Sequence, residues 1–268
     1  MGPILNDKNA LVTGSSSGIG AGIAKYFAGL GANIGVNFRT NAEGGEETAR
    51  AVRAAGSRPV VIRADISSAD DVQRMFREFE EALGRIDILV NNAGITPKVS
   101  LMDTDEDAFD EVVGTNLKGT LMCSREAAGR MQNRGGAILN ISSTHAAATR
   151  RGFGMYGPTK AGIEMLTKAA AVEWGECNIR VNCLRVGFIS VERDPMTPDD
   201  PRYEGVCRRI PVGRPGTPED IAPVAALLCS DLTDFITGAV LPVDGGASCR
   251  QATSTAEMER IQRRLDEQ

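Results

Sequence analysis

Short runs of apolar, often β-branched residues alternate along the chain with longer segments of helical periodicity. The runs predict strands at residues 10–13, 33–38, 59–63, 86–91, 136–142, 179–184 and 239–243. The periodic segments predict helices at residues 19–30, 43–55, 69–83, 105–132, 157–175 and 218–229. Strands that alternate with helices indicate βαβ units and a parallel sheet. Several strands, such as IDILV, are almost entirely apolar, which is expected when helices cover both faces of the sheet.

The alternation runs through most of the chain without an internal repeat or a low-complexity linker. We therefore predict a single α/β domain of the Rossmann type over residues 1–250: a doubly wound, parallel, seven-stranded sheet with helices on both faces. Residues 187–214 interrupt the pattern, because they are rich in Pro, Asp and Arg and show no strand pattern. A long insertion of this kind is either a functional lid or a disordered segment. We interpret about residues 188–212 as a substrate lid, of which residues 190–209 should be mobile without ligand, and residues 251–268 as a polar C-terminal tail.

Composition and charge narrow the classes of partner. The chain has 268 residues, of which 42% are apolar and 24% charged, which is ordinary for a globular protein. A chain of this length can bury a core without a disulfide or a metal. The net charge of −5, with no long basic run, argues against binding to nucleic acid or to an anionic membrane surface.

Targeting signals and metal ligands are equally sparse. No stretch approaches the about 18 uninterrupted apolar residues of a membrane span, and the N-terminus lacks the pattern of a secretory signal. The six cysteines form no C-x-x-C pair, as expected for thiols kept reduced. We therefore expect a cytoplasmic protein. The single histidine, His145, excludes a zinc site of three histidines, and we expect no metal.

A glycine-rich loop joins the first predicted strand to the first predicted helix. It reads Thr13-Gly14-Ser15-Ser16-Ser17-Gly18-Ile19-Gly20. Glycines let the backbone turn tightly and approach a pyrophosphate, and the helix N-terminus offers free N–H groups with a partial positive charge. A glycine-rich turn alone can bind nothing, but its place between strand and helix favours a dinucleotide. We therefore predict that Gly14, Ser16, Ser17, Gly18, Ile19 and Gly20 bind a coenzyme.

The spacing G-x-x-x-G-x-G of this loop resembles the nucleotide signature of the short-chain dehydrogenase/reductase family. Further landmarks of that family follow in order: Asp65-Ile66, Asn91-Asn92-Ala93-Gly94, Asn116, Ser143, Tyr156 with Lys160, and Val243-Asp244-Gly245-Gly246. The resemblance spans about residues 8–246. It implies an NAD(P)-dependent oxidoreductase that interconverts an alcohol and a carbonyl and assembles as a homotetramer.

Tyr156 and Lys160 are the centre of the predicted catalytic site. Residues four apart share one face of a helix, and Ser143, thirteen residues before Tyr156, ends a strand at the edge where open α/β sheets bind ligands. A Tyr-x-x-x-Lys pair by itself is more often a core tyrosine near a surface lysine, but Ser143 favours a site. Reduction of a carbonyl needs a proton donor, oxidation needs a base, and a nearby ammonium favours the phenolate. We predict Tyr156 as the acid/base.

The resemblance assigns roles to the neighbours of Tyr156. Lys160 would also hold the nicotinamide ribose, and Asn116 would hold a water that feeds protons to Lys160. Ser143 would polarise the substrate oxygen by a hydrogen bond. Ser142 is the alternative to Ser143, but the thirteen-residue spacing to Tyr156 favours Ser143.

The resemblance also names coenzyme contacts outside the glycine loop. Asp65 and Ile66 would border the adenine, while Asn92 would only stabilise the sheet. Asn91, Ala93 and Gly94 would let the backbone pass close to the coenzyme. Gly187 and Ile189 would hold the nicotinamide amide, although Val186 and Val191 stand where the family has proline and threonine, with Ser190 as a substitute.

Coenzyme choice depends on the end of the second predicted strand. NAD-preferring relatives place an acid there to bind the ribose diol, whereas this chain has Arg39-Thr40. Arg39 is suited to pair with a 2′-phosphate, although a solvated arginine is the alternative. Ser17 stands where many NADP-dependent relatives carry a second basic residue. We predict that Arg39 and Thr40 contact the coenzyme, with NADP preferred over NAD.

The substrate is less constrained than the reaction. The chain resembles glucose-dehydrogenase-like and 3-oxoacyl-reductase-like members of the family, and we expect a small-molecule substrate such as a sugar or polyol. His145 lies in a Ser-Ser-x-His run that resembles glucose-dehydrogenase-like members, and we predict that it faces the substrate; a surface histidine is the alternative.

Other functions stay open. A 3-oxoacyl-carrier-protein reductase would need a basic patch, for which the chain offers Arg150, Arg151, Arg208 and Arg209. A non-enzymatic nucleotide sensor would lack the catalytic tyrosine or lysine, and both are present. A hydrolase would use Ser143 and His145, but the chain has no G-x-S-x-G elbow.

Overall fold

The computed structural model describes residues 3–250, so the predicted polar tail at 251–268 lies outside the described residues. Seven strands form one parallel sheet in the order β3-β2-β1-β4-β5-β6-β7. The strands are β1 (Asn9–Val12), β2 (Asn33–Phe38), β3 (Pro59–Arg63), β4 (Ile88–Asn91), β5 (Gly136–Ser143), β6 (Ile179–Val186) and β7 (Val240–Val243). The chain order reverses between β1 and β4, which is where open α/β sheets form their ligand crevice.

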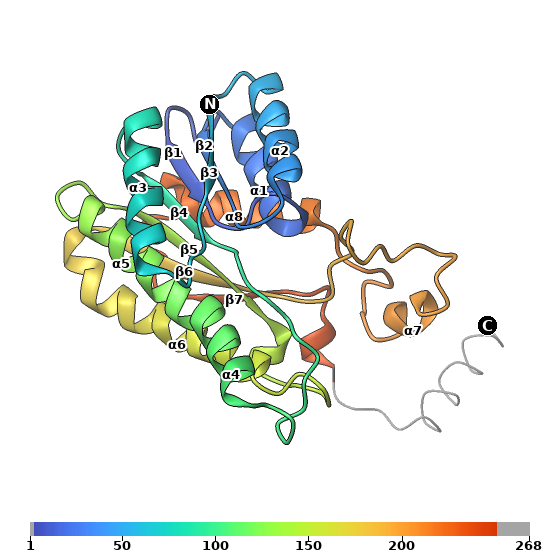
Figure 1. The fold of residues 1–268 in the computed structure, drawn as a ribbon. Helices are drawn as coiled ribbons and strands as arrows, with labels where there is room; N and C mark the ends of the chain where they lie inside the picture. The colour runs from blue at the N-terminus through green and yellow to red at the C-terminus, as the bar shows by residue number, and fades with distance from the viewer. Residues whose placement is uncertain (1–2, 251–268) are drawn as a thin grey trace.

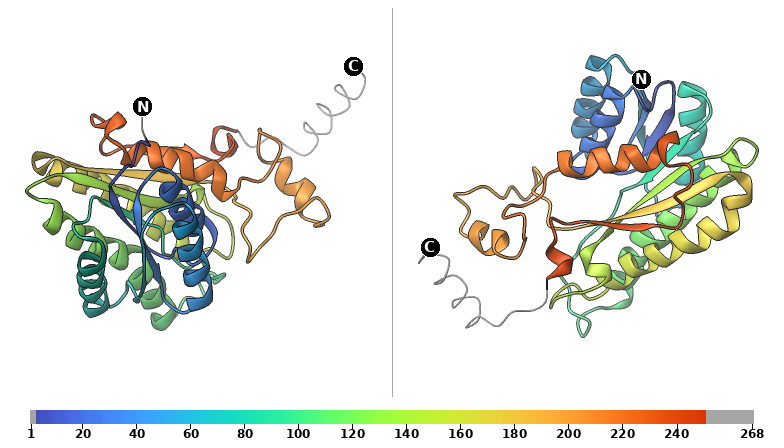
Figure 2. Two further views of the ribbon diagram at one scale, coloured as in Figure 1. Left: turned by 90° about the horizontal axis from the view of Figure 1, so that it is seen from above. Right: turned by 180° about the vertical axis from the view of Figure 1, so that it is seen from behind.

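Helices cover both faces of this sheet, so the Rossmann-type prediction is confirmed (Figures 1 and 2). The helices are α1 (Gly18–Gly29), α2 (Ala42–Ala54), α3 (Ala69–Leu83), α4 (Glu106–Val113), α5 (Gly119–Met131), α6 (Tyr156–Trp174), α7 (Tyr203–Cys207) and α8 (Pro218–Cys229). One apolar core lies between the sheet and α1, α2 and α8. A second lies between the sheet and α3, α5 and α6. Side chains of one strand alternate between the two cores: Val12 enters the first and Leu11 the second.

The long helix predicted at 105–132 is interrupted. A π-helical turn over Gly114–Lys118 separates α4 from α5. Such turns widen the helix and occur frequently at functional sites. The turn contains Asn116, so this residue sits at a local change in backbone geometry that periodicity could not reveal.

The predicted lid projects beyond the end of the sheet (Figures 1 and 2). It contains the short helix α7 and a small apolar cluster in which Met196, Val206 and Ile210 are buried. The lack of apolar periodicity therefore did not mean a lack of apolar contacts. Mobility of this segment without ligand stays a prediction.

Within residues 3–250, no helix is long and apolar enough to cross a membrane. No group of His, Cys, Asp or Glu in the same range is placed to hold a metal. All six cysteines are free.

Candidate active site

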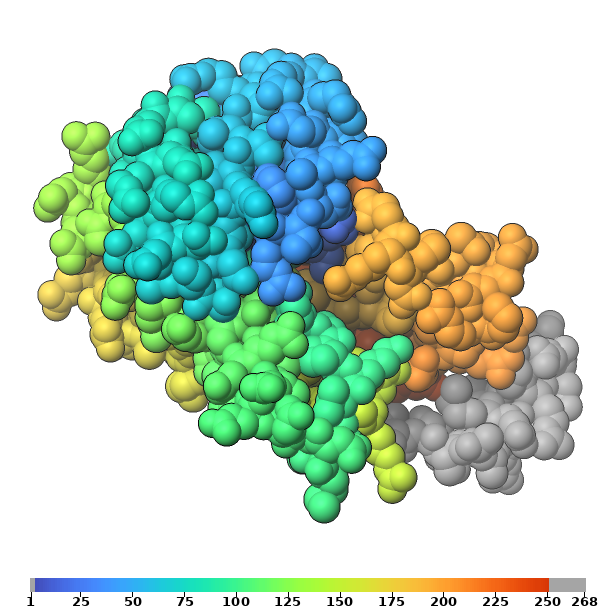
Figure 3. All heavy atoms as spheres, viewed as in Figure 1, coloured from blue at the N-terminus to red at the C-terminus, as the bar shows by residue number. Residues whose placement is uncertain are grey.

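A cavity of about 430 Å³ opens at the carboxyl ends of β1, β2, β4, β5 and β6. Figure 3 shows the hollow between the N-terminal elements and the lobe formed by residues near 190–210. Its volume is in the range of small-molecule and cofactor sites. The predicted site residues that line it are Gly14, Ser16, Ser17, Gly18, Ile19, Arg39, Thr40, Asp65, Ile66, Ala93, Gly94, Ser143, Tyr156, Lys160, Gly187 and Ile189. Four predicted residues lie off its wall: Gly20, Asn91, Asn116 and His145.

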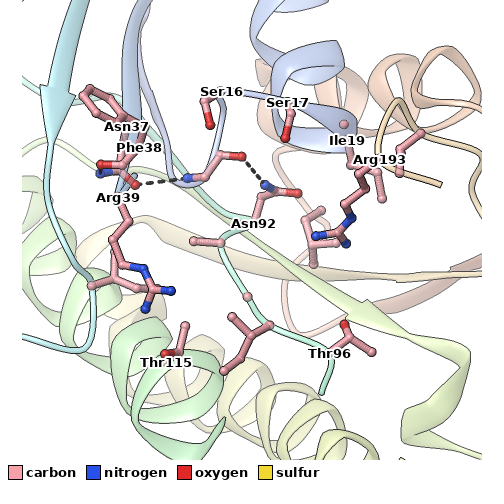
Figure 4. A pocket seen from close by; sticks show the side chains of 18 of the residues that line it. Ser16, Ser17, Ile19, Asn37, Phe38, Arg39, Asn92, Thr96, Thr115 and Arg193 are labelled. Atoms are coloured by element: carbon pink, nitrogen blue, oxygen red, sulfur yellow. Dashed lines mark hydrogen bonds between the residues drawn. The ribbon is translucent and has the colours of Figure 1, made fainter. Parts of the chain in front are cut away.

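The glycine loop is held in a strained shape by hydrogen bonds. Gly14 has a φ of +62°, and a Cβ built on it would lie 2.8 Å from the Cα of Ala93. Only glycine fits this left-handed position against a neighbouring backbone. Gly14 donates its backbone N–H to Oδ1 of Asn37 at 3.0 Å, and its carbonyl accepts from Nδ2 of Asn92 at 3.0 Å; Figure 4 draws both bonds. The loop is thereby fixed before any ligand arrives.

Gly20 supports the loop rather than the cavity. A Cβ at this position would lie 2.4 Å from Nδ2 of Asn92 and 2.5 Å from the carbonyl oxygen of Gly14. Any larger residue would therefore push α1 away from the loop. Gly20 lies off the cavity wall and allows this close packing, and its coenzyme contact stays a prediction.

The side chains of the adjacent residues Asn91 and Asn92 have different surroundings. The side chain of Asn91 is buried behind the cavity and donates to Ser124 Oγ and Asn140 Oδ1, both at 2.8 Å. Asn92 lies on the cavity wall and bonds the glycine loop. Successive strand residues point to opposite faces, so only one of two adjacent asparagines can face the cavity. The side chain of Asn91 thus ties β4 to α5 and β5, and that of Asn92 holds the glycine loop; the close approach of the Asn91 backbone to the coenzyme stays a prediction.

Tyr156, Lys160 and Ser143 are brought together on one wall of the cavity. Tyr156 is the first residue of α6, and Lys160 follows one turn later with its ammonium 5.7 Å from the centre of the tyrosine ring. Lys160 Nζ donates to the carbonyl of Ile141 at 2.8 Å, which anchors it to β5. Ser143 ends β5, and its Oγ accepts from the backbone N–H of His145 at 3.2 Å. Strand and helix thus position the three side chains from two directions.

The hydroxyl of Ser142 is hydrogen-bonded within the protein. Its Oγ lies 3.0 Å from Oε1 of Glu164 and 3.2 Å from the carbonyl oxygen of Lys160. Glu164 in turn accepts two hydrogen bonds from Arg185, at 2.7 Å from Nε and 2.5 Å from Nη2. This network behind the cavity occupies the Ser142 hydroxyl, which leaves Ser143 as the serine available to a substrate.

Asn116 lies next to the site but not on its wall. Its Oδ1 accepts from the backbone N–H of Ile95 at 2.8 Å, and its Nδ2 donates to the carbonyl of Ile95 at 2.9 Å. A Cβ on Gly94 would lie 3.1 Å from Asn116 Oδ1 and 3.6 Å from Lys160 Nζ. Gly94 therefore lies between Asn116 and Lys160, where a side chain would approach both. Both polar atoms of the Asn116 side chain thus bond the loop after β4. The predicted role of Asn116 in holding a water stays a prediction.

His145 is adjacent to Tyr156, although it lies off the cavity wall. Its ring centre is 4.5 Å from that of Phe153 and 5.6 Å from that of Tyr156. Nδ1 lies 3.1 Å from Thr149 Oγ1. Burial lowers the pKa of His145, and the positive charge of Arg150 lowers it further. The histidine is therefore a neutral, stacked side chain near neutral pH.

The residues present fit a dinucleotide. The N-cap of α1, Ser17, makes no side-chain cap bond, so its own side chain does not occupy the N–H groups with which the first turn of the helix can bind a phosphate. Arg39 points from the end of β2 into the pocket, with Nη1 3.6 Å from Oδ2 of Asp65 (Figure 4). Oδ1 of Asp65 accepts from the backbone N–H and Oγ of Ser67, which holds this carboxylate at the cavity edge.

Several wall residues escaped the sequence reasoning: Asn37, Asn92, Thr96, Thr115, Glu192 and Arg193. Asn37 carried a usable signal, since a polar residue in the buried strand NIGVNF needs a partner. Glu192 and Arg193 carried no such signal, because they lie in an irregular segment. Only the tertiary structure brings this segment to the glycine loop.

Comparisons with known proteins agree with this geometry. A family model described as enoyl-(acyl carrier protein) reductase matches residues 14–248. The chain is 40% identical over 240 residues to the 3-oxoacyl-(acyl-carrier-protein) reductase FabG of Staphylococcus aureus, covering 89% of this chain and 97% of that protein. It is 37% identical over 245 residues to 3beta-hydroxysteroid dehydrogenase 1 of Eggerthella lenta, covering 90% and 94%.

Solved structures give the same result. A dehydrogenase/reductase from Sinorhizobium meliloti 1021 is 38% identical with a TM-score of 0.86, over 91% of this chain and 97% of that chain. A short chain dehydrogenase from Burkholderia cenocepacia J2315 in complex with NADP is 32% identical with a TM-score of 0.85, over 91% and 99%. With the family model, the identities and the cavity in agreement, the chain belongs to the short-chain dehydrogenase/reductase family of oxidoreductases.

Proposed function

We propose that the protein uses NADP(H) to interconvert a secondary alcohol and a carbonyl, with Tyr156 as the acid/base. The observation that carries this proposal is that Tyr156, Lys160 and Ser143 line the same cavity as the glycine loop. The coenzyme, when bound, would supply or accept the hydride. The residues of the chain would bind the substrate oxygen and move its proton.

The hydrogen bonds of Ser143 and Lys160 suit these roles. Because Ser143 Oγ accepts from the N–H of His145, its own proton is free to point toward a substrate oxygen. The ammonium of Lys160 has three protons, of which the carbonyl of Ile141 takes one. The remaining positive field favours the phenolate of Tyr156 as its proton leaves. Reduction would therefore proceed with Tyr156 donating its proton to an oxygen that Ser143 already polarises.

NADP is the coenzyme that we propose as preferred. Arg39 enters the cavity at the end of β2, and its only ion pair among residues 3–250 is a 3.6 Å contact to Asp65. A guanidinium at this place can form charged hydrogen bonds with a 2′-phosphate. The related dehydrogenase from Burkholderia cenocepacia, which was solved with NADP, is consistent with this choice.

The substrate we propose to test first is a 3-oxoacyl thioester, which was the alternative in the sequence analysis. The support is the name of the curated relatives at 40% identity, together with four arginines that are exposed in the structure, Arg150, Arg151, Arg208 and Arg209. A sugar or polyol was the first expectation from the sequence. Its support is the resemblance of the Ser-Ser-x-His run at His145 to glucose-dehydrogenase-like members. Cytoplasmic location stays a prediction.

A substrate panel tests the proposal. Purified protein is mixed with NADPH or NADH and with 3-oxoacyl thioesters, sugars, ketosteroids and their alcohols, and nicotinamide absorbance is followed. We expect turnover of at least one carbonyl–alcohol pair, faster with NADPH. Binding of NADPH without turnover of any member, in a protein that is folded, would instead favour the nucleotide-sensing alternative.

A further inference from the structure

The N-terminus of α1 is hydrogen-bonded to a carboxylate that is distant in the sequence, that of Glu192. The N-cap Ser17 makes no side-chain bond, and the first turn of α1 contains no acidic residue. Gly18 nevertheless donates its backbone N–H to Oε2 of Glu192 at 3.0 Å, across a sequence separation of 174 residues. The cap that α1 lacks locally is thus supplied by the predicted lid.

The segment that carries Glu192 rests directly on the glycine loop. Gly18 has a φ of +56°, and a Cβ built on it would lie 3.4 Å from Cγ1 of Val191. Ile189, two residues earlier, pairs with Gly216 and so anchors the start of the segment beside the sheet. Val191, Glu192 and Gly18 all line the cavity. The hydrogen bond between Glu192 and Gly18 therefore lies at the cavity and not at a remote surface.

A carboxylate and a diphosphate need the same donors here. Free N–H groups at the first turn of such a helix bind phosphate oxygens, helped by the partial positive charge of the helix end. Oε2 of Glu192 uses the Gly18 N–H in the same way, as a charge-assisted acceptor. Two anions at one donor repel each other, so a diphosphate and Glu192 exclude one another from this place.

We propose that Glu192 occupies the diphosphate position of the coenzyme site and must leave it when the coenzyme binds. This inference rests on the proposed use of a dinucleotide. Glu192 is then a residue that sets coenzyme affinity, and its release frees the start of the lid from the glycine loop.

Arg193, the next residue, carries the opposite charge into the same cavity. It lines the cavity and reaches toward its centre in Figure 4, and within residues 3–250 its side chain has no hydrogen bond or ion pair. A guanidinium at this place attracts the diphosphate that repels Glu192. The two neighbours should therefore act in opposite directions on coenzyme affinity.

Binding measurements at constant ionic strength test the proposal. Titration calorimetry would compare wild type, Glu192→Gln, Glu192→Ala, Arg193→Ala and the control Asp199→Asn, whose exposed carboxylate lies in the same segment off the cavity wall. Glu192→Gln and Asp199→Asn change the net charge equally, so long-range effects cancel. Because one charge-assisted bond at a helix N-terminus is exchanged, we expect the Kd for NADPH to fall about threefold in Glu192→Gln and about tenfold in Glu192→Ala. Arg193→Ala should raise it, and Asp199→Asn should leave it unchanged.

The choice of ligand locates the competition. ADP carries the diphosphate, so its Kd should follow that of NADPH through the series. Adenosine 2′-monophosphate lacks the diphosphate, and its Kd should be the same in wild type and in both Glu192 variants. Tighter binding of all three ligands would mean that Glu192 acts as a general negative charge, which contradicts a specific competition at Gly18.

A measurement without any ligand tests the contact itself. The amide of Gly18 should exchange hydrogen slowly in the wild-type protein and in Asp199→Asn, and faster in Glu192→Ala. Equal exchange in all three would overturn the contact, and equal or weaker NADPH binding in Glu192→Ala would overturn the competition. Absence of NADPH binding in every protein, with Gly18 still protected by Glu192, would overturn the proposed function as well as the competition, so the two failures give different patterns.

Discussion

The ammonium of Lys160 lies 5.7 Å from the centre of the Tyr156 ring, one helical turn along α6. Its bond to the carbonyl of Ile141 at 2.8 Å fixes this separation from the strand side. Lys160 is only 5% exposed, so water screens its charge little. The pair is arranged so that a phenolate, once formed, meets a fixed opposite charge.

Replacing Tyr156 with Phe should abolish turnover while coenzyme affinity stays near that of wild type. The substitution removes the proton donor and keeps the ring that packs against His145. Steady-state kinetics and NADPH titration of the same preparation would show this split. A kcat above about a tenth of the wild-type value would mean that another group transfers the proton.

Arg39 should discriminate between the two coenzymes. Arg39→Ala should weaken NADPH binding by about 1.5–3 kcal/mol, because a charged hydrogen bond to the 2′-phosphate is lost, and should change NADH binding little. Arg53→Ala, an exposed arginine on α2 away from the cavity, controls for the change in net charge. Equal losses for NADPH and NADH would refute the assignment.

His145 should affect the substrate and not the coenzyme. His145→Ala removes a ring that stacks on Phe153 and lies 5.6 Å from the Tyr156 ring, so KM for the true substrate should rise about threefold to tenfold, as for loss of one aromatic contact. A pKa below the ordinary 6.5 keeps the imidazole mostly neutral above pH 7, so the KM ratio should be constant between pH 7 and 8. Thr149→Ala, which removes the partner of Nδ1, should have a smaller effect. An unchanged KM would make His145 a bystander.

Self-association should bury the apolar side chains that the described chain leaves in solvent. Met165 and Val172, seven residues apart on α6, are 64% and 82% exposed, and Phe235 is fully exposed. Exposed apolar side chains that recur on one helix face are typical of subunit contacts. We predict a homotetramer by light scattering at micromolar concentration, and a smaller species for Val172→Arg. A wild-type monomer would contradict the prediction.

The fold could be predicted from the sequence because its signals are local. Each strand is a short apolar run, and the glycine loop, Ser143 and Tyr156 lie at element ends that periodicity marks within a few residues. The π-helical turn at Asn116 leaves no such mark, because the apolar spacing of a helix changes by only one residue there.

The parts of the site that escaped prediction depend on contacts between distant segments. The choice between Asn91 and Asn92 follows from which face of β4 meets the loop after β1, and a side chain's face is decided by packing. The engagement of Ser142 by Glu164 joins β5 to the middle of α6. Glu192 reaches Gly18 over 174 residues, and no local pattern encodes such an approach.

Asp220 gives the chain a pH-dependent contribution to stability that can be isolated. Hydrogen bonds from the Arg214 guanidinium, both 2.7 Å long, lower the pKa of Asp220 to about 2, and the backbone N–H of Thr217 at the N-cap of α8 adds to this. A carboxylate whose pKa is lower in the folded state stabilises that state above its ordinary pKa of 3.8. The contribution fades as the pH falls toward 2, where the folded state also takes up the proton.

Replacing Asp220 with Asn should therefore destabilise the protein at pH 7 and much less at low pH. Asparagine can still accept from the Thr217 N–H, so the substitution removes mainly the charge-dependent part. The Asp220 side chain is 34% exposed and that of Arg214 49%, and solvent screening reduces the cost to about 1 kcal/mol. Melting temperatures of wild type and Asp220→Asn, measured at pH 7 and pH 3 beside the exposed control Asp199→Asn, should differ at pH 7 by more than at pH 3. A difference that stays constant between the two pH values would mean that the ion pair with Arg214 contributes nothing and that only the shape of the cap matters.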